Sequence, residues 1–194
     1  MKAIIIRMWH NNQDHFEWRY HYFASCVLPR LQAQTVSDFD ICILSDPKDH
    51  QRLKALDKRI KPFTMITDGY DYRTQSNFTQ DMTKGLDKYN LQIRLDSDDL
   101  VEPDFVQKCA EGKKVVTFQP ELFILKKLQV KKMKARYRDD RPSMFMSFRS
   151  DMDDYKCIYS EVFFRFGRYD CTLHPEGTCY MTIHGTNKGT SENS

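Results

Sequence analysis

The sequence lacks the long apolar segments and glycine-rich loops that characterise several large protein classes. No apolar run approaches about 18 residues, so no membrane-spanning segment is expected. Glycine is scarce, with seven residues in 194, and no Gly-rich phosphate-binding loop is present, which disfavours P-loop chemistry. The formal net charge of +3 is too small to indicate nucleic acid as a partner.

Paired cysteines are also missing. The six cysteines include no Cys-x-x-Cys pair, so a structural zinc site is not expected. Cys26, Cys42 and Cys109 lie in apolar patterns that are typical of buried free thiols. This usage favours a reducing compartment, and we expect a cytoplasmic protein.

What is present is enough for a folded core, because 40% of the residues are hydrophobic and 13% are aromatic. Alternating strand and helix patterns in the first hundred residues predict an α/β fold. We expect strands at 3–8, 39–44, 63–67 and 91–95, and helices at 14–34, 50–58, 77–89 and 103–111. The first helix would bury one face, formed by Phe16, Tyr20, Phe23, Val27 and Leu31.

The second half of the sequence does not continue the alternation of strand and helix patterns. Strands are expected at 115–118, 122–125, 128–130, 144–148 and 179–183, with a hairpin among them. The polar segment 185–194 is interpreted as a frayed end or as a linker to a further domain of a longer chain. At this length, a single domain over 1–194 is the default.

The most informative stretch is 91–99, Leu-Gln-Ile-Arg-Leu-Asp-Ser-Asp-Asp. A half-buried strand there would end in the carboxylates of Asp96, Asp98 and Asp99, which repel one another by roughly 1–4 kcal/mol. A cation would keep them ionised, and Mg²⁺ or Mn²⁺ often bridges carboxylates to substrate phosphates. The stretch therefore predicts a divalent metal and a diphosphate-bearing substrate. The alternative is an acidic turn that caps the helix beginning near Pro103.

Charged residues also follow other predicted strands. Arg7, Asp46, Asp68 and Asp96 all lie at or near strand ends, where open α/β sheets bind their ligands. The four segments would meet at one crevice, although loops are polar in any case and Asp46 before Pro47 is also an ordinary turn pair.

Three stretches resemble the nucleotide-sugar glycosyltransferases of GT-A fold, and most closely a group of rhamnosyltransferases. They are Leu28-Pro-Arg-Leu-Gln-Ala-Gln-Thr35 with the strand that ends in Ser45-Asp46-Pro47, then Arg94 to Asp99, then Ile183-His-Gly-Thr-Asn187. The resemblance implies a three-layer α/β/α sandwich, with a Rossmann-like nucleotide-sugar-binding half over 1–111. A mixed-strand acceptor half and C-terminal tail would occupy 112–194. The small size and divergent middle resemble a trimmed domain of a large algal virus that glycosylates its own capsid, which would place the protein in the host cytoplasm.

The resemblance also implies residue roles. Asp98 would be the principal metal ligand, with Asp96 or Asp99 contributing and one of these two holding the ribose hydroxyls. His184 would approach the metal or the diphosphate, although a lone histidine is more often structural. The nucleotide pocket would be lined by Asp46, Arg7 and the loop beginning at Asp68, with Arg94 bracing the acidic residues.

The acceptor half carries weaker indications. Asp151, Asp153 and Asp154 are candidates for the carboxylate with which an inverting transferase deprotonates its acceptor; they equally suit a helix N-terminus or a surface loop. The basic run from Lys126 to Arg141 is interpreted as a solvated face, and alternatively as a contact for donor phosphates or an anionic acceptor.

We therefore expect a soluble, Mn²⁺- or Mg²⁺-dependent glycosyltransferase that moves rhamnose or a hexose such as glucose. The donor would be a UDP-sugar and the acceptor a glycan or glycoprotein. One alternative is a metal-dependent phospho- or nucleotidyltransferase that uses the same acidic residues. Another is a non-catalytic carbohydrate- or polyanion-binding module that uses the basic run.

Overall fold

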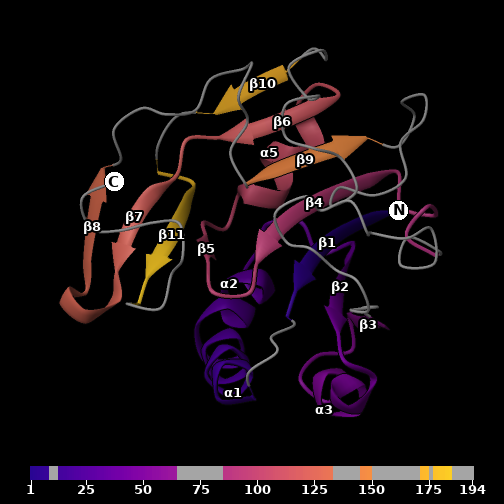
Figure 1. Ribbon diagram of the computed structural model, residues 1–194. Coiled ribbons are helices and arrows are strands. Elements are labelled where there is room, and N and C mark those ends of the chain that lie inside the picture. The colour runs from indigo at the N-terminus through magenta and orange to yellow at the C-terminus, as the bar shows by residue number, and fades with distance from the viewer. Residues whose placement is uncertain (9–12, 65–84, 133–144, 150–170, 175–176, 185–194) are drawn as a thin grey trace, which may run out of the picture.

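Four parallel strands form one side of the larger of two sheets (Figure 1). The computed structural model describes residues 1–8, 13–64, 85–132, 145–149, 171–174 and 177–184, and all strands and helices named below lie within these ranges. The parallel strands are β4 (Leu91–Asp96), β1 (Lys2–Arg7), β2 (Phe39–Ser45) and β3 (Ile60–Thr64), in that spatial order. Their carboxyl ends therefore share one edge of the sheet.

Strands from the second half of the chain extend the same sheet. These are β9 (Met146–Arg149), antiparallel to β4, then β6 (Val115–Phe118) and β10 (Cys171–His174). The resulting order is β10-β6-β9-β4-β1-β2-β3. Strands from before and after position 111 thus share one hydrogen-bonded sheet.

Both faces of the central strands are buried, as the near-continuous apolar sequences of β1 and β2 require. Ile4 and Ile6 pack with helical residues in one core, while Ile5 and Leu44 on the opposite face are also almost fully buried. This arrangement is that of a layered α/β fold, and it confirms the predicted fold class.

The first predicted helix is a continuous helical run with an internal irregularity. It consists of α1 (Gln13–Tyr22), a π-helical segment η1 (Phe23–Val27) and α2 (Leu28–Gln32). Pro29 follows η1 and has no N–H to donate to the carbonyl four residues earlier, which favours a local departure from α geometry. All five residues of the predicted apolar face are buried: Phe16, Tyr20, Phe23, Val27 and Leu31.

A second, four-stranded sheet lies beside the first (Figure 1). Its order is β5 (Leu100–Val101), β11 (Cys179–Ile183), β7 (Glu121–Ile124) and β8 (Gln129–Lys132). β7 and β8 form the expected antiparallel hairpin around the short helix η3 (Leu125–Lys127). Because β5 follows the acidic residues directly and pairs with β11, this sheet brings the segment near residue 184 to them.

The remaining helices are η2 (Pro47–Asp49), α3 (His50–Lys54) and α5 (Phe105–Glu111). Three predicted boundaries were wrong: α3 stops at Lys54, β3 begins at Ile60, and 85–88 is a turn rather than the end of a helix. Residues 65–67 and 77–84 lie outside the described residues. Within the described part of the chain, no helix is both long and apolar enough to cross a membrane.

Candidate functional site

A buried acidic turn, Asp96 to Asp99, connects β4 to β5. The Asp99 N–H donates to the Asp96 carbonyl at 3.2 Å, which closes the turn. Ser97, Asp98 and Asp99 are all buried, with relative exposures of 5% or less. The turn lies at the carboxyl end of a central strand, where the sheet topology predicts a ligand site.

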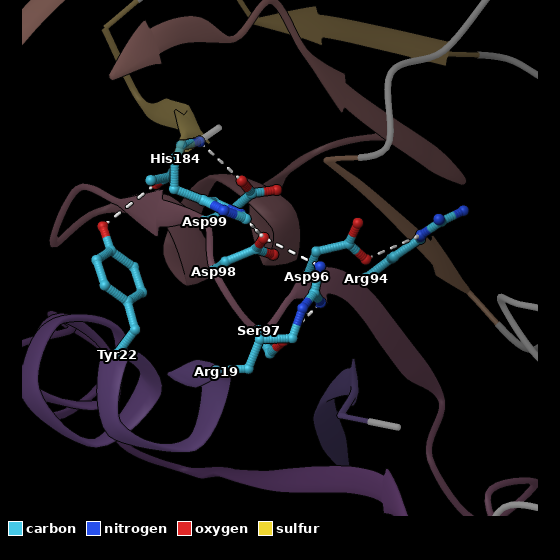
Figure 2. A network of polar contacts seen from close by, with 9 residues as sticks. Arg19, Tyr22, Arg94, Asp96, Ser97, Asp98, Asp99 and His184 are labelled. Atoms are coloured by element: carbon cyan, nitrogen blue, oxygen red, sulfur yellow. Dashed lines mark hydrogen bonds and ion pairs between the residues drawn. The ribbon is translucent and has the colours of Figure 1, made fainter. Parts of the chain in front are cut away.

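Asp98 is held between two basic side chains from distant segments (Figure 2). Its Oδ2 lies 2.9 Å from His184 Nε2, just beyond β11, and 3.2 Å from Arg19 Nη2 on α1. Burial alone would raise the pKa of the Asp98 carboxyl, but the His184 hydrogen bond and the charges of Arg19 and His184 hold it below its usual value. Asp98 is therefore ionised in a largely buried position.

Asp99 faces the opposite electrostatic situation. Its Oδ1 accepts a 3.0 Å hydrogen bond from the backbone N–H of Thr182 in β11. Burial raises the pKa of Asp99 well above its usual value, and the charges of Asp98 and Asp96 raise it further. The Asp99 side chain consequently ties β11 to the acidic turn, and its ionisation is disfavoured.

Aromatic side chains of α1 cover the same region. The Trp18 ring lies 4.2 Å from the His184 ring between centroids, and it stacks on Tyr22 at 5.2 Å. The Tyr22 hydroxyl lies 3.3 Å from Thr182 Oγ1, and burial raises its pKa. The Trp18 ring thus packs against His184, whose side chain is only 4% exposed.

The strand ends next to the turn bring further predicted residues near it. Arg7, the last residue of β1, is in register with Asp96 of β4. The Arg94 Nε lies 4.0 Å from Asp96 Oδ1 in a buried ion pair. Asp46 follows β2 at the same edge of the sheet, where its Oδ1 accepts from the Lys48 N–H at 3.0 Å and caps η2.

Four predicted site residues lie outside the described residues: Asp68, Asp151, Asp153 and Asp154. The basic run is described only up to Lys132. There, β8 is exposed along its whole length and forms an edge of the smaller sheet.

The carboxylates of the acidic turn suit a metal ion that is bound jointly by protein and substrate, rather than by protein ligands alone. Within the described ranges, no group of three or more His, Cys, Asp or Glu side chains is arranged to hold a metal ion. However, Asp96 Oδ1 is buried and accepts no hydrogen bond from the described residues. Such an oxygen, beside ionised Asp98, fits Mg²⁺, which one or two carboxylates and substrate phosphates commonly hold together.

Sequence reasoning missed the contributions of α1 and β11. Arg19, Trp18 and Tyr22 lie in a helix where charged and aromatic residues are ordinary, and Thr182 acts through its backbone. The i, i+4 spacing of Trp18 and Tyr22 was a signal that these two side chains share a helix face.

The structure is similar to solved structures of TarS from S. aureus. One covers 94% of this chain and 36% of the TarS chain, with a TM-score of 0.60 and 12% identity. TarS 1-349 in complex with UDP-GlcNAc gives a TM-score of 0.60 at 12% identity, over 96% of this chain and 59% of that chain. The complex of TarS 1-349 with UDP gives 0.58 at 13% identity, over 94% and 60%.

These likenesses concern the fold, which is GT-A-like, and this chain spans less than two thirds of each TarS chain. A comparison with curated protein sequences found no match. The sequence does match the family described as "Putative rhamnosyl transferase" over residues 7–187, a range that includes the acidic turn and His184. The chain therefore belongs to this rhamnosyltransferase family of glycosyltransferases.

Proposed function

We propose that this protein transfers a sugar from a nucleoside diphosphate sugar to a hydroxyl group of a glycan or glycoprotein. The observation that carries the proposal is the buried acidic turn at the end of β4, which His184 contacts from 86 residues further along the chain. Ligands of open α/β sheets bind beyond the carboxyl ends of the strands, where this turn lies.

A divalent cation, Mn²⁺ or Mg²⁺, would be held by Asp98 and Asp96 together with the donor diphosphate. When bound, such a cation stabilises the negative charge that develops on the leaving diphosphate. In this scheme Asp99 is a positioning residue, because its carboxylate accepts a hydrogen bond from the backbone of β11. His184 orients Asp98 through the 2.9 Å contact.

The nucleotide would lie across the ends of β1 and β2. Arg7 is in register with both Leu44 of β2 and Asp96 of β4, so it lies between the carboxyl ends of these two strands. Asp46 and the segment beginning at Asp68 remain our candidates for the nucleoside pocket. Asp151, Asp153 and Asp154 remain the candidates for the base that activates the acceptor.

For the donor we propose a UDP-sugar, with rhamnose or a hexose as the transferred group. Support comes from the family description, which names rhamnosyl transfer, and from the fold shared with TarS, which was solved with UDP-GlcNAc and with UDP. A cytoplasmic location and a capsid glycoprotein as acceptor stay predictions from the sequence.

Calorimetric titration of UDP and several UDP-sugars, first with Mn²⁺ and then with EDTA, tests this function. We expect Mn²⁺-dependent binding that Asp98→Asn weakens by more than about tenfold, because the variant loses a charged ligand. Asp38→Asn is the matched control: Asp38 is 71% exposed and pairs with Lys2 at the opposite edge of the sheet.

The absence of UDP binding under both conditions would overturn the UDP-donor claim. Binding of an anionic glycan that is independent of metal, sensitive to salt and unchanged by Asp98→Asn would instead indicate a polyanion-binding module. Release of free sugar and UDP from a UDP-sugar would exclude that module and identify the donor.

A further inference from the structure

Arg19 links α1 to the acidic turn through two contacts (Figure 2). Its Nη1 donates to Ser97 Oγ at 3.0 Å, and its Nη2 lies 3.2 Å from Asp98 Oδ2. Ser97 is completely buried and the Asp98 side chain is 6% exposed, whereas the Arg19 side chain is 27% exposed. One side of the guanidinium is therefore held by buried groups, while solvent reaches part of the residue.

The guanidinium has more donors than these contacts use. Arginine carries five N–H groups in a planar fork, and the contacts found among the described residues engage one on each of two nitrogens. With respect to the described residues, the guanidinium therefore keeps further N–H groups for an anion. Paired N–H groups of this kind bind phosphate oxygens with defined geometry.

Arg19 also competes with a metal ion for Asp98. The Asp98 Oδ2 already faces both Arg19 and His184. A cation bound to this carboxylate would lie close to the guanidinium, and the two positive charges would repel. A diphosphate removes the conflict, because its negative charge attracts both the cation and the guanidinium.

We propose that Arg19 is a donor-binding residue that makes metal and diphosphate binding interdependent. In the empty site it is the counter-ion of Asp98; with metal and donor present it contacts the diphosphate. The inference rests on the proposed function and adds to it a residue and a coupling between the two ligands. Metal alone binds weakly, diphosphate alone binds weakly, and each strengthens the other.

Calorimetry with Mn²⁺ alone, UDP alone and UDP in the presence of Mn²⁺ tests this role. For Arg19→Gln we expect Mn²⁺ alone to bind roughly three- to tenfold more tightly, since a repelling charge is gone. UDP in the presence of Mn²⁺ should bind at least about tenfold more weakly, since a charged phosphate contact is lost. A general loss of stability would not produce two changes of opposite sign.

Arg30→Gln is the matched control. Arg30 lies in α2 of the same helical run, its side chain is 46% exposed, and it pairs with Glu102 at 3.6 Å. The substitution removes the same charge away from the turn, and both affinities should match those of the wild type. Arg19→Lys keeps the charge without the fork, so Mn²⁺ alone should bind as in the wild type and UDP more weakly.

If thermal melting shows that Arg19→Gln is unstable, Arg19→Lys replaces it as the test of the diphosphate contact. A wild-type protein that binds UDP with Mn²⁺, combined with Arg19 variants that behave like Arg30→Gln, would overturn the role of Arg19 alone. A wild-type protein that binds no UDP in any condition would overturn the UDP-donor claim and the diphosphate contact together.

Discussion

At the scale of single residues, Asp98 and Asp99 are neighbours in sequence with opposite ionisation behaviour. Arg19 and His184 face Asp98, whose pKa is lowered despite burial. Asp99 is buried, accepts a backbone hydrogen bond and has its pKa raised by burial and by its acidic neighbours. The difference arises from contacts with α1 and β11 rather than from the turn itself.

This difference predicts the pH dependence of stability for Asp99→Asn in EDTA. The folded-state pKa of Asp99 is above the unfolded value of about 3.9. The free energy of unfolding should therefore fall as pH rises through the window between these two values, because ionisation in the folded state is costly. Asparagine cannot ionise and can still accept from the Thr182 N–H. The variant should be more stable at pH 8, by about 1.4 kcal/mol for each unit of pKa shift.

Urea unfolding of both proteins between pH 4 and pH 8 measures the effect. The exposed Asp38, whose pKa is lowered by its hydrogen bond to Lys2, supplies Asp38→Asn as a control with the opposite sign. Parallel pH profiles for wild type and Asp99→Asn would contradict the assignment of a raised pKa to Asp99.

At the scale of elements, the connection from α5 to β6 depends on a glycine with little space around it. Gly112 ends α5, and its N–H donates to the Lys108 carbonyl at 3.2 Å. A Cβ at this position would overlap Cγ2 of Val116, which is completely buried in β6. The backbone of Gly112 has a negative φ of −74°, so the constraint is steric rather than conformational.

Gly112→Ala should therefore lower the free energy of unfolding by roughly 1–3 kcal/mol, the usual cost of overpacking. Urea unfolding at neutral pH measures it. Val116→Ala removes the overlapping methyl group, so the cost of Gly112→Ala should shrink in that background, giving a favourable coupling in a double-mutant cycle. Additive effects of the two substitutions would show that the overlap is relieved in another way.

Elements were predictable from sequence where alternation was long and apolar. β1, β2 and β4 lie within a residue or two of the expected ranges, because their apolar residues are buried on both faces of the sheet. β5 has two residues, too few to show any period. β10 was not predicted, because its four residues include one large apolar side chain and show no alternation. That side chain, Leu173, is 42% exposed.

The site was predictable only in its local part. The acidic turn was evident because three carboxylates follow one strand, and His184 was named through a family resemblance. Arg19 and Thr182 were not predicted as site residues, because their roles depend on tertiary contacts that span 78 and 83 positions in sequence. The periodicity of apolar residues indicates which face of a segment is buried. The contacts of Arg19 and Thr182 depend instead on how α1 and β11 pack against the acidic turn.

At the scale of the whole molecule, the larger sheet does not divide at position 111. The strands after position 111, β10, β6 and β9, continue the sheet directly from β4, because β9 pairs with β4 on one side and with β6 on the other. Removing 112–194 would strip β4 of a neighbour and take β11 away from the acidic turn. We therefore propose that nucleotide and acceptor halves belong to one cooperative unit.

The full chain should accordingly unfold in a single transition. Circular dichroism, which follows the strands, and tryptophan fluorescence, to which Trp18 beside His184 contributes, should give coincident urea curves. The fragment 1–111 should show no cooperative transition. Two separate transitions, or a folded 1–111 fragment, would show that the halves are independent.

The contact between Asp98 and His184 also has a consequence for the newly made chain. The two residues are 86 positions apart, and ribosomes add about 5–20 residues per second, so roughly 4–17 seconds separate their synthesis. Arg19 is made before either, but its contact with Asp98 belongs to the folded unit, and we expect residues 1–111 not to fold alone. In the nascent chain the carboxylates of the acidic turn should therefore stay solvated until the second half has been made, and they become buried only when both halves fold together.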